Sequence, residues 1–275
     1  MTAMIFAHRG SSAAYAEHTR AAYLQAIADG ADGVECDLHL TADGALVLLH
    51  DEDISRTSNS SGAVAKMTLA QLRAVDFSSW HGCAIPPEFG TTAEQLLTLA
   101  ELLDILSTAS RPMSLAIEFK YGGHFDPALV EAALDTLRGR GWSPETSTVV
   151  HSVGHAVGEI EVSFMSFHPE AVLFLAQHVA AEKLCALLEV VGPEDRLQWQ
   201  RQQLVDDGVA LLAGPGVQYL RTHLGDVARW LAVGRTLRVW TVDSAQDLEL
   251  CLGAGVTQLT SNKPRALREM LTERH

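Results

Sequence analysis

The chain has 275 residues, of which 47% are hydrophobic and 20% charged, the usual proportions of a globular protein. Its formal net charge is −14, from 20 basic and 34 acidic residues. A surface of this sign lacks the basic patch of a nucleic-acid-binding protein and disfavours docking on anionic lipid. An anionic ligand would therefore need local positive charge, supplied by a metal ion or by a few placed Arg and Lys side chains.

The sequence contains no apolar run near the roughly 18 residues of a membrane span, so stable membrane insertion is not expected. Its four cysteines, at positions 36, 83, 185 and 251, are widely spaced and include no Cys-x-x-Cys pair. That usage is typical of free thiols in a reducing compartment. The first predicted strand begins at residue 3 or 4, which leaves no room for a signal peptide. We expect a cytoplasmic protein.

Short apolar segments rich in β-forming residues alternate with amphipathic segments along most of the chain. The predicted strands are 4–7, 33–37, 114–118, 160–166, 184–189, 217–220, 237–242 and 257–260, with an extra extended segment at 45–49. The predicted helices are 20–28, 94–106, 127–138, 169–179, 224–232, 245–252 and 264–271. Thr19 is placed to cap the first helix and Gly30 to end it.

Eight strands that alternate with helices indicate an α/β protein with a parallel sheet, and the chain length favours closure into a (β/α)8 TIM barrel. A doubly wound open sheet is the alternative. The stretch at about 51–111 interrupts the alternation and is interpreted as an insertion after the second strand. We expect residues 1–275 to form one domain.

Charged residues gather where predicted strands end. Alternate side chains of a strand share a face, so Glu35 and Asp37 point the same way, as do Glu118 and Lys120. In this barrel type the carboxyl ends of the strands form the catalytic face. Three carboxylates there would repel one another unless a hard cation such as Mg²⁺ or Ca²⁺ joined them. Salt bridges with Arg9 and Lys120 are the alternative.

Two histidines follow extended segments directly: His8 after the first strand and His50 after the segment at 45–49. Histidines beside a metal site are suited to proton transfer near neutral pH. Arg9 carries a planar guanidinium that fits two phosphate oxygens. Because the chain has twelve histidines, the hypothesis depends on the position of these two at strand ends.

These residues form a series that resembles the glycerophosphodiester phosphodiesterase family. The series comprises Ala7-His8-Arg9-Gly10, Glu17-x-Thr19, residues 30–37, Leu40-Thr41-x-Asp43-Gly44, His50-Asp51, Arg56-Thr57, residues 117–120, residues 166–170, residues 239–242 and the last strand with Pro264. The likeness spans nearly the whole chain in order, and the first sixty residues carry its most specific part.

The resemblance implies a barrel with a small insertion after its second strand. It implies a divalent metal, Mg²⁺ or Ca²⁺, at the positions of Glu35, Asp37 and Glu118. It further implies acid–base catalysis by His8 and His50, phosphate binding by Arg9 and Lys120, and an aromatic wall at Trp240 that packs on glycerol carbons; plain core packing is the alternative for Trp240.

The implied reaction is hydrolysis of a small-molecule glycerophosphodiester to glycerol 3-phosphate and an alcohol. A phospholipase-like enzyme that acts on lysolipids and a catalytically silent barrel that binds phosphodiesters are the alternatives. The sequence leaves the oligomeric state open, a homo-oligomer included.

Several positions depart from the family pattern. Ala16 and His18 stand where proline and asparagine are usual. Asp243 stands where asparagine is common, and the last strand ends in Ser261-Asn262 where an aspartate usually follows the threonine. None of these changes removes a candidate metal ligand or proton-transfer residue.

Overall fold

The computed structural model describes residues 3–154, 156–192 and 195–273. Eight parallel strands pair in a ring in which each strand contacts the next and the last returns to the first. They are β1 (Met4–Ala7), β2 (Gly33–Leu40), β4 (Met113–Phe119), β7 (Ala156–Ser166), β8 (Leu184–Leu188), β9 (Leu212–Pro215), β10 (Thr236–Val239) and β11 (Gln258–Ser261). The predicted TIM barrel is thus confirmed, and the open sheet is excluded because β11 pairs with β1.

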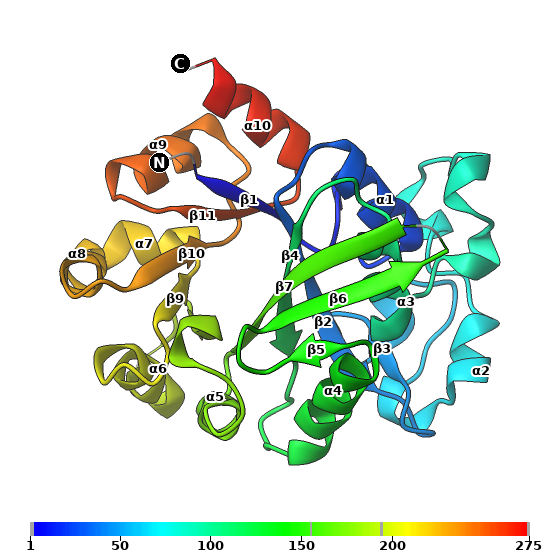
Figure 1. Cartoon of the computed structure of the whole chain (residues 1–275), viewed down its shortest axis with the longest axis horizontal. Coiled ribbons are helices and arrows are strands. Elements are labelled where there is room, and N and C mark those ends of the chain that lie inside the picture. The colour runs from blue at the N-terminus through cyan, green and yellow to red at the C-terminus, as the bar shows by residue number, and fades with distance from the viewer. Residues whose placement is uncertain (1–2, 155, 193–194, 274–275) are drawn as a thin grey trace.

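Helices lie around the outside of the ring (Figure 1). They are α1 (Arg20–Ala28), α3 (Leu99–Ser107), α4 (Pro127–Gly139), α5 (Pro169–Leu175), α6 (Arg196–Asp206), α7 (Val217–Thr222), α8 (Leu224–Ala232), α9 (Ala245–Gly253) and α10 (Pro264–Thr272). The Thr19 side chain accepts from the backbone N of Ala22 and caps α1, as the sequence predicts. Gly30, with a φ of +76°, follows the end of that helix.

One predicted strand is wrong. Residues 217–220 form most of α7, and the sixth barrel strand is instead β9, whose sequence is Leu-Ala-Gly-Pro. Glycine and proline usually indicate a turn, which hid this strand. Helix α6 was also missed, because its polar sequence carries few apolar residues at helical spacing.

Three further strands run antiparallel at the margins of the barrel. Strand β3 (Leu46–Leu48) pairs with β2, as the extra segment at 45–49 predicts. Strands β5 (Trp142–Ser143) and β6 (Thr148–Val153), which the sequence pattern did not indicate, extend the sheet beside β7. None of these three interrupts the closed ring.

The segment between β3 and α3 lies on one side of the barrel, at the right of Figure 1. It contains α2 (Leu69–Arg73) and short 3₁₀ turns at Ile54–Arg56, Val64–Lys66, Ser79–His81, Pro87–Phe89 and Thr92–Glu94; a sixth such turn, Ala181–Lys183, precedes β8. Buried apolar residues hold the segment together and against β3: Val47, Leu49, Ile54, Val64, Leu72, Phe77 and Leu96.

The main core lies between the barrel strands and the surrounding helices, and a smaller apolar cluster that includes Phe6, Met165 and Leu187 fills the barrel interior. Among the described residues, no helix has the length and apolar character needed to cross a membrane.

Candidate active site

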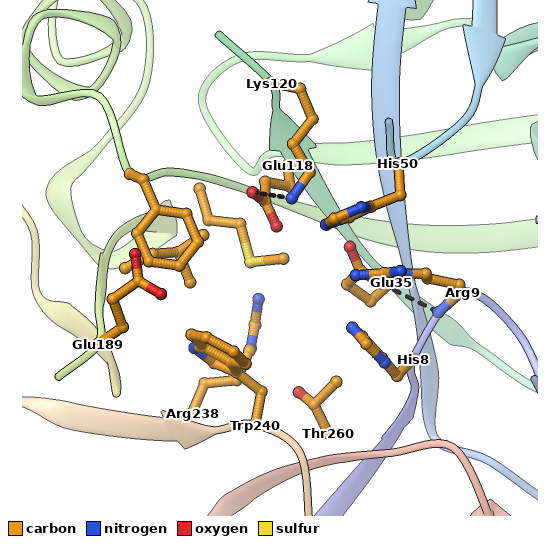
Figure 2. A pocket seen from close by; sticks show the side chains of 13 residues that line it. His8, Arg9, Glu35, His50, Glu118, Lys120, Glu189, Arg238, Trp240 and Thr260 are labelled. Carbon is orange, nitrogen blue, oxygen red and sulfur yellow. Dashed lines mark hydrogen bonds and ion pairs between the residues drawn. The ribbon is translucent and has the colours of Figure 1, made fainter. Parts of the chain in front are cut away.

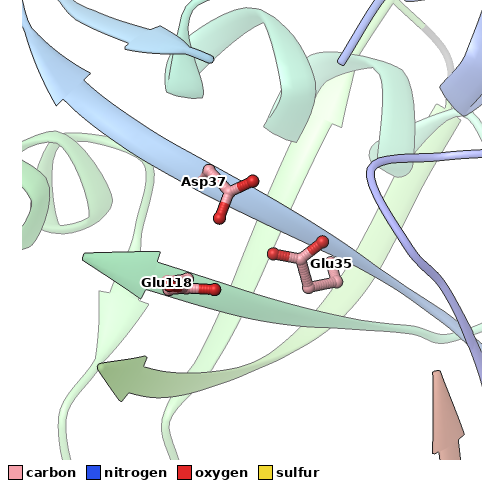
Figure 3. Close-up of side chains that lie close together, drawn as sticks. All are labelled: Glu35, Asp37 and Glu118. Carbon is pink, nitrogen blue, oxygen red and sulfur yellow. The ribbon is translucent and has the colours of Figure 1, made fainter. Parts of the chain in front are cut away.

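Three carboxylates from two neighbouring strands lie close together (Figure 3). Glu35 and Asp37 lie on β2 and Glu118 lies on β4, where it pairs in register with Asp37. One oxygen from each of the three lies within 4.8 Å of the other two, and all three residues are buried. The expectation that strand parity brings these side chains to one place is met.

Two basic residues contact the carboxylates. Lys120 Nζ lies 3.1 Å from Asp37 Oδ1 and 2.5 Å from Glu118 Oε1. Arg9 Nε lies 3.1 Å from Asp37 Oδ2, and the backbone N of Arg9 donates to Glu35 Oε2 over 3.0 Å. The other oxygen of Glu35, Oε1, is buried and has no hydrogen-bond partner. A buried carboxylate oxygen without a partner is costly, and a cation would satisfy it.

The three carboxylates differ in proton affinity. Burial, followed by repulsion from Asp37 and Glu118, raises the pKa of Glu35 well above its usual value. Burial alone would also raise the pKa of Asp37, but Lys120, His18 and Arg9 together hold it well below its usual value. Burial raises the pKa of Glu118 to about 7, against the opposing effect of Lys120. Asp37 is therefore ionised at neutral pH, and a cation would favour ionisation of the other two.

A cavity of about 180 Å³ opens beside the carboxylates (Figure 2). Seven of the eight residues singled out from the sequence line it; Asp37 is fully buried beside it. Its lining residues are His8, Arg9, Glu35, His50, Glu118, Lys120, Met165, Phe167, Leu187, Glu189, Arg238, Trp240 and Thr260. The structure therefore brings the predicted site residues together, while their roles stay predictions.

The rings of His8 and His50 both point into this cavity (Figure 2). His8 Nδ1 lies 2.7 Å from Asn262 Oδ1, and His50 Nδ1 lies 2.6 Å from Asp51 Oδ1. Burial and the charge of Arg9 lower the pKa of His8 to about 4, while burial and Lys120 lower the pKa of His50. Each ring thus has its Nδ1 engaged by an oxygen and its Nε2 left for a ligand.

A line of alternating charges joins the two sides of the cavity. Glu17 Oε1 accepts from Arg9 Nη1 over 3.0 Å and from Arg56 Nη2 over 2.8 Å. Arg56 Nε in turn donates to Asp51 Oδ2 over 2.5 Å, and Asp51 holds His50. Glu17 thereby acts on the site through the two arginines.

His18, at a position where the family usually has asparagine, lies buried behind the carboxylates. Its Nε2 donates to Asp37 Oδ2 over 2.8 Å, and its Nδ1 lies 2.9 Å from the hydroxyl oxygen of Tyr23. The imidazole thus orients a candidate metal ligand, which is a typical role of residues behind a metal site. The structure also explains why residue 10 is a glycine. Its φ is +81°, and a Cβ there would lie 2.7 Å from Ala22 Cβ of α1.

The sequence pattern missed several lining residues. Arg238 lies on β10, two residues before Trp240, which directly follows that strand, so the same parity argument would have placed both on one face. The Arg238 side chain is buried, donates to Ser163 and Gln258, and lies over the Phe6 ring. Glu189, just after β8, carried no local signal beyond its place at a strand end.

Comparison with known proteins agrees with this geometry. The model of the glycerophosphoryl diester phosphodiesterase family matches residues 8–266. The chain belongs to this family. A Mycobacterium tuberculosis protein named "Probable glycerophosphodiester phosphodiesterase 1" is 34% identical over 270 residues, which cover 98% of this chain and 92% of that protein. A glycerophosphodiester phosphodiesterase of Caldanaerobacter subterraneus is 27% identical over 97% of both chains.

The fold is likewise similar to solved structures. An Oleispira antarctica phosphodiesterase, solved in complex with the product sn-glycerol-3-phosphate, superposes with a TM-score of 0.77 at 21% identity, over 98% of this chain and 96% of that one. A glycerophosphodiester phosphodiesterase from Thermotoga maritima gives a TM-score of 0.71 at 19% identity, over 98% and 99%. These likenesses support the barrel fold.

Proposed function

We propose that the chain hydrolyses glycerophosphodiesters to glycerol 3-phosphate and an alcohol. The observation that carries the proposal is the convergence, in one cavity, of a carboxylate cluster, two basic side chains and two histidines with available Nε2 atoms. Family membership and full-length relatives that bear this activity in their names support it.

Glu35, Asp37 and Glu118 are proposed to hold a divalent cation. Carboxylate oxygens are the ligands that Mg²⁺ and Ca²⁺ prefer, and the unpartnered Oε1 of Glu35 supports such a site. When bound, the cation supplies positive charge that polarises a phosphoryl oxygen and stabilises the charge of the transition state.

The chain's own cations complete the binding of the phosphate. Arg9 presents a guanidinium at the cavity, and Lys120, which here offsets two carboxylates, becomes available to a phosphate oxygen once these carboxylates are neutralised. Arg238 adds a third positive charge on the cavity wall. Trp240 stands edge-on to Phe167, with ring centroids 5.6 Å apart, and offers an apolar wall for glycerol carbons.

His8 and His50 are proposed to move protons. One accepts the proton of the nucleophile, which is water or the substrate's own glycerol hydroxyl, and the other donates a proton to the departing alcohol oxygen. Their Nδ1 contacts with Asn262 and Asp51 leave both Nε2 atoms on the cavity side, as this exchange requires.

The cavity favours a short diester over a lysolipid. Its volume of about 180 Å³ is below the roughly 300–1,000 Å³ typical of sites for drug-sized ligands, which leaves little room for an acyl chain. The alternative of a silent barrel has less support, because the proposed ligands and proton carriers all converge. The four cysteines are free, in keeping with the proposed cytoplasmic location.

Glu35→Gln and His50→Ala test this function. With glycerophosphocholine and either Mg²⁺ or Ca²⁺, both variants are expected to lose activity by ~10²-fold or more. His50 is a proposed acid–base group, and such groups contribute ~10²–10⁴-fold, while Glu35 is a proposed ligand of the cation. The matched control is Glu161→Gln, which removes a carboxylate that pairs with Lys183 on the exterior. Turnover near that of the unaltered protein in either variant would refute the assignment.

A further inference from the structure

Asp243 and Asn262, two of the departures from the family pattern, lie in contact behind His8. Asn262 Nδ2 donates to Asp243 Oδ2 over 2.5 Å, and His8 Nδ1 lies 2.7 Å from Asn262 Oδ1. The three side chains follow the ends of β10, β11 and β1, which are neighbours in the barrel. Asp243 and Asn262 thus form one contacting pair of an acid and an amide.

These contacts fix the orientation of the Asn262 amide. Asp243 Oδ1 already accepts from Ser261 Oγ over 2.8 Å and from the backbone N of Asn262 over 2.9 Å. A carboxylate only accepts hydrogen bonds, so the NH₂ of Asn262 must face Oδ2 of Asp243. The amide oxygen then faces His8.

The orientation of the amide determines the tautomer of His8. An amide oxygen has no hydrogen to donate, so the contact requires that His8 carry its proton on Nδ1. The lone pair is then on Nε2, and the ring points into the cavity (Figure 2). The Ser12 hydroxyl oxygen lies 2.8 Å from both Asn262 Oδ1 and the carbonyl oxygen of His8, and its single hydrogen can be donated to only one of them.

We propose that Asp243 and Asn262 are positioning residues that hold His8 in the tautomer whose Nε2 is free for proton exchange with the substrate. The inference deepens the proposed function and depends on it for the activity part of its test. The second histidine has a different support, because His50 donates directly to the carboxylate of Asp51.

Asp243→Asn is the decisive single variant. The new amide keeps its oxygen toward Ser261 Oγ and the backbone N of Asn262, so its NH₂ faces Asn262. Two NH₂ groups cannot hydrogen-bond, so the Asn262 amide turns over and presents its own NH₂ to His8. His8 then accepts at Nδ1 and carries its proton on Nε2. We expect kcat to fall by ~10²-fold or more with KM changed far less.

The double variant Asp243→Asn, Asn262→Asp separates this role from a merely structural one. An amide at position 243 donates to a carboxylate at position 262, which in turn accepts from His8 Nδ1–H. The active tautomer returns, and kcat should recover by at least ~10-fold over the single variant. Asp207→Asn, an exposed change at the end of α6, is the matched control.

Nitrogen-15 NMR of the histidine rings gives a readout that needs no turnover, with the His8 signals assigned by their loss in His8→Asn. We expect a proton on Nδ1 in the unaltered protein and the double variant, and on Nε2 in Asp243→Asn. A His8 that keeps its proton on Nδ1 in Asp243→Asn, or a double variant no more active than the single one, would overturn the inference. If the unaltered protein shows no turnover, that result counts against the proposed function. The position of the His8 proton, measured by NMR, would still decide this inference.

Discussion

Glu17 shows how one residue connects stability to the site. Its side chain is 13% exposed and contacts both Arg9 and Arg56. Burial alone would raise its pKa, but the two arginines outweigh burial and lower the pKa of Glu17 to about 2. A carboxylate whose pKa is lower in the folded than in the unfolded chain stabilises the fold above its unfolded pKa, and this contribution is lost as the pH falls.

We therefore expect Glu17→Gln to lower the free energy of unfolding at pH 7 by roughly 1–3 kcal/mol, reduced from the full pKa effect because Arg56 is half exposed. The difference from the unaltered protein should shrink as the pH falls from 4.5 to about 2, between the usual and the folded pKa of Glu17. Urea unfolding curves across that range check this expectation. A difference that stays constant with pH would show that the ion pairs do not stabilise the fold.

At the scale of elements, alternation along strands was the most informative sequence signal. It placed Glu35 with Asp37 and Glu118 with Lys120, because side-chain direction within a strand is local. Contacts between distant segments had no such signal. His8 and Asn262 are 254 residues apart and meet only because β11 returns to β1.

Strand β9 and helix α6 were not predicted, because the local sequence of each does not indicate the structure that it adopts. Strand β9 contains glycine and proline, yet it lies buried between β8 and β10. Tertiary pairing therefore overrides its weak strand preference. That residues 51–111 are an insertion within a single domain stays a prediction; helix α3, which lies in that range, is part of the barrel's outer layer.

Helix α2 provides a test of the segment between β3 and α3. Leu72 is fully buried in its apolar cluster, whereas Leu69 of the same helix is partly exposed. Leu72→Ala should lower the free energy of unfolding by about 2–5 kcal/mol, because it leaves a cavity. Leu69→Ala is the matched control and should cost clearly less. Chemical denaturation of both variants decides the point, and equal losses would show that the cluster does not hold the segment in place.

At the scale of the whole molecule, the net charge of −14 opposes the approach of an anionic substrate, so the local cations must overcome it. Arg9, Lys120 and Arg238 all line the same cavity, but they face Glu35, Glu118 and Glu189 there. With Asp37 buried beside them, four carboxyl groups offset the three cations at the site. A bound divalent cation would turn this balance in favour of phosphate.

Diffraction from crystals soaked with Mg²⁺ or Ca²⁺ and glycerol 3-phosphate tests this account most directly. We predict one cation bonded to Glu35, Asp37 and Glu118 at about 2.0–2.6 Å, with the phosphate between that cation and Arg9. A cation bound elsewhere, or a phosphate outside the cavity that His8 and His50 line, would contradict it.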